Sequence, residues 1–414
     1  MTQGGIPSSP EQMQRYFKAA QVFTPSSPVD SQELFAGRPE QITQVLNAVA
    51  QKGQHVILYG ERGVGKTSLA NYILQIIEKM VVGELTSAII NCDGVDQFFT
   101  IWQKVFRELG NISNQPSSEA ELLPEDVTPE HIRYILQQQS NRSIIVIDEL
   151  DRVSAHSENS EYNFVASAGS ATELLADTIK TLSDHSIETT IILVGVADSV
   201  DELINEHASI ERSLVQVQMP RMSPSELYEL LDKRLKLLEM DIQSEFKEQI
   251  AFLSQGLPSY THLLALHASQ HAIMRNSKNI EQNDLGYAIS QAIQKAFQSI
   301  VNSYYQATSS SRETIYAEVL LACALTSKDN LGYFAARDVE KPMSAIMKRP
   351  YKTTGFSRNL KDFCDDKRGA VLQKRGRRFG FVNPMMQPYV IMHGLANELI
   401  DFKMLKESSR ALES

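Results

Sequence analysis

One short stretch constrains this chain more than any other. Residues 55–70 read HVILYGERGVGKTSLA, an apolar run that breaks into a glycine-rich turn ending in Lys-Thr. Glycine tolerates positive φ and lets backbone approach a ligand closely. The pattern G-x-x-x-x-G-K-[ST] therefore predicts a loop around a phosphate chain, because an expected strand precedes it and an expected helix follows it. Its residues are Gly60, Gly63, Val64, Gly65, Lys66, Thr67 and Ser68.

Each part of this loop has an expected task. Backbone N–H groups and the start of the following helix would point at the β- and γ-phosphates of a nucleotide. Lys66 would add a positive charge, and the Thr67 hydroxyl would reach Mg²⁺. A glycine-rich turn that contains Lys-Thr by chance is the alternative, and the strand and helix around the loop argue against it.

Between residues 34 and 220 short β-branched runs alternate with helical patterns, which predicts a parallel sheet covered on both faces. The expected strands are 55–59, 87–92, 143–147, 189–196 and 215–219. The expected helices are 39–52, 66–80, 95–109, 129–138 and 172–183.

After Pro220 the strand signals stop, and four helical patterns predict a small bundle: 224–240, 244–254, 260–275 and 283–305. A plausible linker, 307–312, follows. Three further helices are expected at 314–325, 335–348 and 357–365, and a β-hairpin about residues 374–377. Three helices and a hairpin are the ingredients of a winged helix.

The expected domains are a flexible lead-in at 1–30, a nucleotide-binding core at 31–221, a helical lid at 222–307, a winged helix at 308–400 and a tail at 401–414. No apolar run approaches the roughly 20 residues of a bilayer span, and the N-terminus lacks signal-peptide character. Three widely spaced cysteines fit reduced thiols. We expect a cytoplasmic protein without membrane contact.

Charge is distributed unevenly along the chain. The net charge is −10, which argues against a uniformly adhesive surface for nucleic acid. Residues 341–381, however, hold twelve Lys or Arg against three Asp, so this stretch carries +9 and the remaining chain −19. This end of the chain is therefore built differently from the rest.

A second motif, SIIVIDELD at residues 143–151, places acids at the end of an apolar strand. Asp148 is expected to hold the metal's water shell, and Glu149 to polarise an attacking water. Acids often cap strand ends, but the phosphate loop, expected on a neighbouring strand, favours the metal site. Asp151 and Arg152 are interpreted as a solvated helix-start pair.

Two later segments offer further candidates. The strand TTIILVGV, 189–196, leads to Asp198 and Ser199, either of which could sense the γ-phosphate or cap a helix. Arg212 and Arg221 flank the last expected strand. An arginine there could reach a neighbouring subunit's γ-phosphate, and Arg212 is favoured over Arg221; a surface ion pair is the alternative.

Together the segments LFAGR, GERGVGKT, VIDELD, LVGVADS and RSLVQVQMPRM, followed by a helical lid and a winged helix, resemble the AAA+ ATPases. The likeness is greatest to the branch of origin-recognition and replication-initiator ATPases and transposon target-selection ATPases. It implies an α/β fold with a P-loop parallel-sheet AAA+ core, an all-α lid and a winged-helix domain. It also implies ATP and Mg²⁺ as cofactors and hydrolysis at subunit interfaces of a homo-oligomer.

The resemblance also assigns residues to roles. Phe35, Gly37 and Arg38 would lie near the adenine, and Arg212 would act across a subunit boundary. Many AAA+ lids carry a G-x-x-R arginine, but this chain reads GLPSYTHLL at 256–264, with His262 as a weak substitute. A Gly-Leu-Pro here is similar to switch ATPases, which makes slow turnover an expectation. The loop 154–171 is either a pore-facing or a merely mobile surface segment.

The basic end predicts contact with duplex DNA. In winged helices the third helix enters a major groove while the hairpin touches backbone. The candidate contacts are Arg358, Lys361, Lys374, Arg375, Arg377 and Arg378. A solvated basic face, or a winged helix used for internal packing, is the alternative.

Two functions follow from these patterns. The first is an ATPase that self-associates and acts on DNA, in a mobile-element, replication or genome-defence role, with a nuclease or transposase as a possible protein partner. The second is a signalling switch that binds ATP, assembles and recruits a protein effector without DNA.

Overall fold

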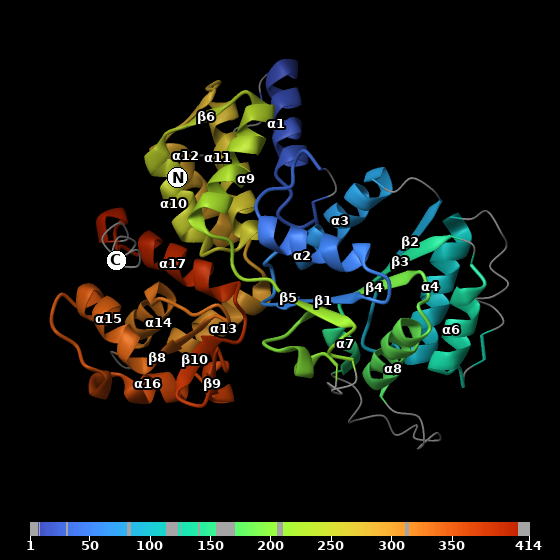
Figure 1. Ribbon diagram of the computed structural model, residues 1–414. Helices are drawn as coiled ribbons and strands as arrows, with labels where there is room; N and C mark the ends of the chain where they lie inside the picture. The colour runs from blue at the N-terminus through green and yellow to red at the C-terminus, as the bar shows by residue number, and fades with distance from the viewer. Residues whose placement is uncertain are drawn as a thin grey trace. The chain divides into compact units, whose positions relative to one another are not determined.

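The structure is a computed structural model that describes residues 7, 9–29, 32–80, 84–112, 123–124, 126–139, 141–154, 170–204, 210–310 and 314–404. The chain forms two compact units (Figure 1). The sheet unit comprises 28–61 and 65–219, and the helical unit comprises 1–27, 62–64 and 220–414. Within the described residues no helix is long and apolar enough to span a bilayer.

A five-stranded parallel sheet forms the centre of the sheet unit, in the order β2-β3-β4-β1-β5. Its strands are β1 (His55–Gly60), β2 (Leu85–Asn91), β3 (Arg142–Asp148), β4 (Thr189–Val196) and β5 (Leu214–Gln218). The predicted parallel sheet is confirmed. The expectation that the strands before the phosphate loop and before Asp148 are neighbours is wrong, because β4 lies between β1 and β3. Continuous apolar runs predict buried strands but do not encode their order.

Helices cover both faces of this sheet. They are α2 (Pro39–Ala50), α3 (Lys66–Met80), α4 (Phe98–Ile112), α6 (Pro129–Gln137), α7 (Asp151–Ser154), α8 (Ala171–Asp184) and the 3-10 turn η1 (Val200–Glu202). Alternate strand residues such as Ile145 and Ile147 join one core with α4, α6 and α8. The intervening Ile144 and Val146 are also fully buried, and α3 contacts β1, β3 and β4. Both faces are therefore core, which explains the lack of polar alternation in the strands.

Trp102, the only tryptophan in the chain, anchors the α4 face of the core. It is 0% exposed and packs against Phe98 and Phe106. Trp102→Ala is expected to lower the free energy of unfolding by about 3–5 kcal/mol through the cavity it leaves, measured by urea denaturation followed by circular dichroism. Trp102→Phe should cost much less, since the indole N–H has no acceptor among the described residues. Equal losses in the two variants would contradict this.

The helical unit begins with the lid. Its elements are α1 (Pro10–Val22), α9 (Pro224–Leu238), β6 (Asp241–Ile242), α10 (Ser244–Ser254), α11 (Pro258–Met274), β7 (Asn279–Ile280), α12 (Gln282–Gln294) and α13 (Gln298–Thr308). Ser223 and Glu226 form a capping box that starts α9 at Pro224. The expected single helix over 283–305 is divided, because Phe297 adopts an extended conformation at the start of α13. No glycine or proline marks that break in the sequence.

The N-terminal segment belongs to the lid. α1 contacts α9 and α11, and the Gln12 side chain donates to the carbonyls of Ile273 (2.7 Å) and Met274 (3.0 Å). These carbonyls lie at the end of α11, where a helix leaves acceptors unsatisfied. Instead of a flexible lead-in, residues 10–22 therefore form a helix that caps another helix about 260 residues later in the chain.

The C-terminal part combines helices with a small antiparallel sheet in the order β8-β10-β9. Its elements are α14 (Tyr316–Leu325), β8 (Tyr333–Ala335), η2 (Ala336–Val339), α15 (Glu340–Ile346), η3 (Thr353–Gly355), α16 (Ser357–Asp362), η4 (Asp366–Arg368), β9 (Leu372–Arg375), β10 (Arg378–Phe381) and α17 (Met386–Ala396). Three helices and a hairpin occur in the order expected of a winged helix. β8 and α17 carried no separate signal in the sequence.

Candidate phosphate and metal site

The phosphate loop follows β1 with the backbone that its glycines allow. Gly60, Gly63 and Gly65 have φ of 146°, 86° and 96°. A Cβ at Gly60 would lie 2.5 Å from the Met219 carbonyl oxygen, so no other residue fits there without displacing β5. Lys66, only 8% exposed, donates from Nζ to the carbonyls of Gly60 (2.9 Å) and Glu61 (2.8 Å). The ammonium group is thus held over the loop at the start of α3.

Thr67 and Asp148 meet although β4 separates their strands. The Thr67 hydroxyl donates to Asp148 Oδ2 at 2.6 Å, and Asp148 Oδ1 accepts the Glu149 N–H at 2.7 Å. Asp148 is 4% exposed at the carboxyl end of β3. The two oxygen groups expected to hold Mg²⁺ therefore converge on one point at the sheet edge. Other members of the loop are also in place: Val64 is 1% exposed, and Ser68 Oγ accepts the Val29 N–H at 3.1 Å.

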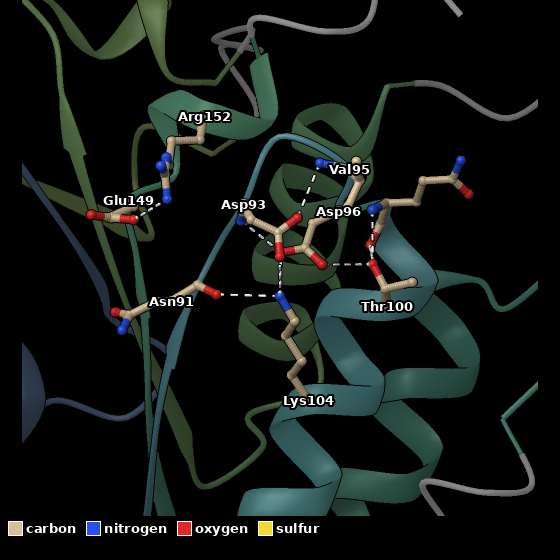
Figure 2. Close-up of polar contacts among 9 residues, drawn as sticks. Asn91, Asp93, Val95, Asp96, Thr100, Lys104, Glu149 and Arg152 are labelled. Atoms are coloured by element: carbon tan, nitrogen blue, oxygen red, sulfur yellow. Dashed lines mark hydrogen bonds and ion pairs between the residues drawn. The ribbon is translucent and has the colours of Figure 1, made fainter.

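Glu149 leaves the strand in an unusual conformation. Its φ is 57°, in the left-handed region that non-glycine residues rarely adopt. The carboxylate is half exposed and accepts from Arg152 Nη1 at 2.8 Å (Figure 2). The backbone turn directs Glu149 away from the core that holds Asp148. Arg152 is thus a partner of the candidate base, whereas the sequence indicated only a solvated helix-start pair.

The end of β2 carries a polar cluster that sequence reasoning missed (Figure 2). Lys104 of α4 donates to Asp93 Oδ2 (3.1 Å) and pairs with Asp96, which also accepts from Thr100 Oγ1 (3.0 Å). The N–H of Val95 and the Lys104 ammonium lower the pKa of Asp93. The spacing of Asp93 and Asp96 before a helix was the available signal. The cluster fixes the turn next to Asn91, which pairs with Asp148 in the sheet register.

The end of β4 is held by side-chain to backbone hydrogen bonds. Asp151 Oδ1 accepts the Val196 N–H (2.8 Å), and Glu202 accepts the Asp198 N–H (2.9 Å). Ser199 occupies the cap position of η1 without a side-chain cap. Asp151 therefore ties β4 to the segment after β3, and Asp198 follows the strand between the two that carry the phosphate loop and Asp148.

Two of the three residues expected near the adenine, Phe35 and Arg38, are buried in the sheet unit, and Gly37 between them is partly exposed. Phe35, 7% exposed, stacks on Tyr72 of α3 with ring centroids 4.0 Å apart and an interplanar angle of 9°. Gly37 and Arg38 have φ of 71° and 67°, and Arg38 is 2% exposed at the start of α2. This turn is thus fixed against the helix that begins with Lys66.

The two candidate arginines differ in their surroundings. Arg212 is exposed (74%) and pairs with Asp184 at the end of α8. It precedes β5, which runs parallel to β1, so it lies at the opposite sheet edge from the phosphate loop. Arg221 donates to the Gln255 carbonyl (3.1 Å) and to Gln387 Oε1 (2.6 Å) inside the helical unit.

The lid turn needs glycine. Gly256 has a φ of 76°, and a Cβ there would lie 2.6 Å from Arg221 Cβ. Pro258 occupies the first turn of α11. His262, 4% exposed, accepts the Thr24 N–H at Nδ1 (3.0 Å). Burial, and then the charge of Arg234, hold the His262 pKa well below its usual range.

Every candidate DNA contact lies on the surface of the C-terminal part. Arg358 and Lys361 are exposed on α16, and Lys374, Arg375, Arg377 and Arg378 are exposed around the hairpin turn. Arg358 is 92% exposed, and Arg378 pairs with Asp329. The turn residue Gly376 has a φ of 60° and open space around it. Most of the loop 154–171 lies outside the described residues.

The chain is similar in sequence to a described protein family and to a curated protein. The profile of a family described as Novel STAND NTPase 1 matches residues 23–344. The ORC1-type DNA replication protein 1 of Archaeoglobus fulgidus is 23% identical over 210 residues, 48% of this chain and 46% of that protein. The chain thus spans about half the length of that relative.

Solved structures resemble most of the chain. A Walker-type ATPase of Pyrococcus abyssi is similar over 89% of this chain and 99% of that chain, with 16% identity and a TM-score of 0.52. The ORC1 protein of Aeropyrum pernix in complex with DNA is similar over 92% of this chain and 97% of that chain, with 15% identity and a TM-score of 0.48. At 16% identity, the Pyrococcus abyssi structure shows the fold of this chain and nothing about its activity.

Proposed function

Because this chain belongs to the Novel STAND NTPase 1 family, we propose that it binds ATP with Mg²⁺ and hydrolyses it to ADP and phosphate. Its fold is that of an AAA+ ATPase, as the resemblance implied. The observation that carries the proposal is the 2.6 Å contact between Thr67 and Asp148, beside the buried Lys66 ammonium. The cation and the hydroxyl of adjacent loop residues meet a carboxylate from a distant strand where a phosphate chain would lie.

The residues at this edge suit magnesium. Mg²⁺ prefers hard oxygen ligands and keeps several waters, so one hydroxyl and one carboxylate are enough protein ligands when phosphates supply the rest. Thr67 Oγ1 and Asp148 Oδ2 are such a pair, and both would turn from each other toward the ion. When bound, the ion would neutralise phosphate charge. Lys66 would exchange its two carbonyl partners for phosphate oxygens.

Glu149 is the proposed base for the attacking water, and Arg212 the proposed finger from a neighbouring subunit. β1 spans five residue steps, so Arg212 lies roughly 17 Å from its own phosphate loop. This distance supports a role for Arg212 at the phosphates of a second copy of the chain rather than at its own. Arg221 is a weaker candidate, since it already bonds Gln255 and Gln387.

A mixing experiment tests the shared site. Arg212→Ala and Glu149→Gln subunits should each be inactive alone, and mixtures should recover part of the hydrolysis, because some interfaces then combine an intact Glu149 with an intact Arg212. Full activity of a monomer at high dilution would eliminate the proposal. Mass measurements with and without ATP would give the assembly directly.

We propose further that nucleotide-dependent assemblies act on duplex DNA through the C-terminal part. Four exposed cations, Arg377 in the two-residue turn and Lys374, Arg375 and Arg378 beside it, suit contacts to backbone phosphates with little sequence information. An ORC1-type DNA replication protein among the similar proteins favours DNA as the ligand. The role would lie in replication, a mobile element or genome defence.

Replacing Lys374, Arg375, Arg377 and Arg378 by Ala is expected to abolish DNA binding at moderate salt. The slope of log affinity against log salt is negative, and each lost phosphate contact makes it less steep by about 0.9. The measurement is fluorescence anisotropy of a labelled duplex across a salt series. Lys233→Ala with Lys236→Ala, two exposed cations of α9, is the control. Wild-type affinity in the quadruple variant would remove the hairpin from the interface.

The second candidate is an ATP-dependent signalling switch that recruits a protein effector. The Gly-Leu-Pro turn at the start of α11 and the lack of a lid arginine at the G-x-x-R position favour it. Absence of salt-dependent DNA binding, together with ATP-dependent assembly, would select this candidate.

A further inference from the structure

Arg152 contacts the carboxylate that is proposed as the base. Its Nη1 donates to Glu149 Oε2 at 2.8 Å, three residues back along the chain. Figure 2 shows the Glu149 side chain pointing away from Asp93 and Asp96 at the end of β2. On the other side of β3 from β2, the sheet continues with β4 and then β1. The carboxylate therefore points toward the side of the sheet that carries the phosphate loop.

The backbone that carries Arg152 is fixed to β4. The Leu150 N–H donates to the Val194 carbonyl at 3.0 Å, and Leu150 is 0% exposed. Asp151 Oδ1 accepts the Val196 N–H at 2.8 Å. The guanidinium is thus presented from a segment that is tied to the strand next to β1.

The acid at the end of β2 does not compete for Arg152, because it already has partners. Asp93 accepts from the Val95 N–H at 3.0 Å and from Lys104 Nζ at 3.1 Å. These two contacts, more than the charge of Arg152, lower the pKa of Asp93. Among the described residues Arg152 forms an ion pair with Glu149 alone.

We infer that Arg152 is a positioning residue for the proposed hydrolysis, because it holds Glu149 Oε2 and leaves Oε1 to face the attacking water. The inference rests on the proposed ATPase function. A half-exposed glutamate without a partner samples several rotamers, most of which move the carboxylate away from a given water. A carboxylate oxygen that accepts from a guanidinium leaves its twin free to accept a proton. The left-handed backbone and the ion pair thus fix both ends of the Glu149 side chain.

The proposed step moves one proton and exchanges one bond at phosphorus. The attacking water gives a proton to Glu149 Oε1 while its oxygen bonds to the γ-phosphorus. The bond between that phosphorus and the bridging oxygen breaks, and ADP leaves with the electron pair. Arg152 acts in this step through Glu149 and not on the nucleotide.

Single-turnover hydrolysis of ATP by the full chain tests the inference in a double-mutant cycle. Arg152→Met should slow hydrolysis by about 2–5-fold, the range that an exposed ion pair contributes, and leave the ATP affinity from titration unchanged. In the Glu149→Gln background the same change should have no effect, because the base is already absent. Arg152→Lys keeps a cation beside Glu149 and should recover part of the lost rate.

Arg133→Met is the matched control. Arg133 pairs with Glu130 at the same i,i+3 spacing on α6, outside the candidate site, so its loss should leave the rate unchanged. Equal slowing by Arg152→Met with and without Glu149 would indicate a general structural effect and would overturn the inference. An unchanged or faster rate in Arg152→Met would overturn it as well.

The proposed function is judged separately, by whether the wild type hydrolyses ATP at all. A wild type without hydrolysis contradicts the ATPase, and the positioning role with it. Hydrolysis without coupling between Arg152 and Glu149 contradicts the positioning role alone.

Discussion

Lys66→Ala is expected to weaken ATP binding by about 100-fold or more. Lys66 is 8% exposed, and two carbonyls of the loop already hold its ammonium group. The side chain therefore loses little conformational entropy when it binds the phosphates. Hydrogen bonds to charged groups contribute about 1.5–3 kcal/mol each, and two such bonds to phosphate oxygens account for the loss. Isothermal titration of the purified protein with Mg²⁺ and ATP measures it.

The matched control is Lys79→Ala, in the last turn of the same helix, where the side chain donates to Gln32. It removes the same charge from α3 at a distance from the loop and should leave ATP affinity unchanged. Similar affinities for Lys66→Ala and wild type would contradict the phosphate-loop assignment, and with it the proposed ATPase.

Local signals predicted well the helices and strands that flank the candidate phosphate loop. The helix after the loop was expected at 66–80 and begins and ends there, because the strand pattern stops at Gly60 and an apolar helical period starts after the glycine-rich loop, at Lys66. The strand 189–196 was likewise correct, since its β-branched run is bounded by polar residues. The type and bounds of such elements depend on residues close together in the chain, so the sequence pattern predicts them.

What the sequence could not provide depends on residues far apart in the chain. The insertion of β4 between β1 and β3, the packing of α1 on the lid and the anchoring of β2 by Lys104 all arise from tertiary contacts. Sequence reasoning also missed a contact between residues only three apart. Arg152 pairs with Glu149, whose backbone is left-handed, and nothing in VIDELDR marks that conformation.

Glu149→Gln is expected to leave ATP binding intact while lowering the rate of hydrolysis by about 10²–10⁴-fold. The amide keeps the size of the side chain and an oxygen that can accept from Arg152, but it cannot take a proton from water. Asp148 and Thr67, which would hold the ion, are not touched by the change. Phosphate release under single-turnover conditions separates the chemical step from binding, which titration with ATP measures in parallel.

Glu188→Gln provides the control for that experiment. It makes the same replacement just before β4, at the edge of the sheet away from the phosphate loop, where the carboxylate pairs only with the exposed Lys52 among the described residues. An exposed pair of this kind contributes little, so activity should be unchanged. If Glu149→Gln hydrolysed ATP at the wild-type rate, the base would have to be another group at the same edge, and Asp198 after β4 would be the next residue to replace. If Glu149→Gln lost both ATP binding and ATP hydrolysis, the left-handed turn at Glu149 would instead shape the nucleotide site itself.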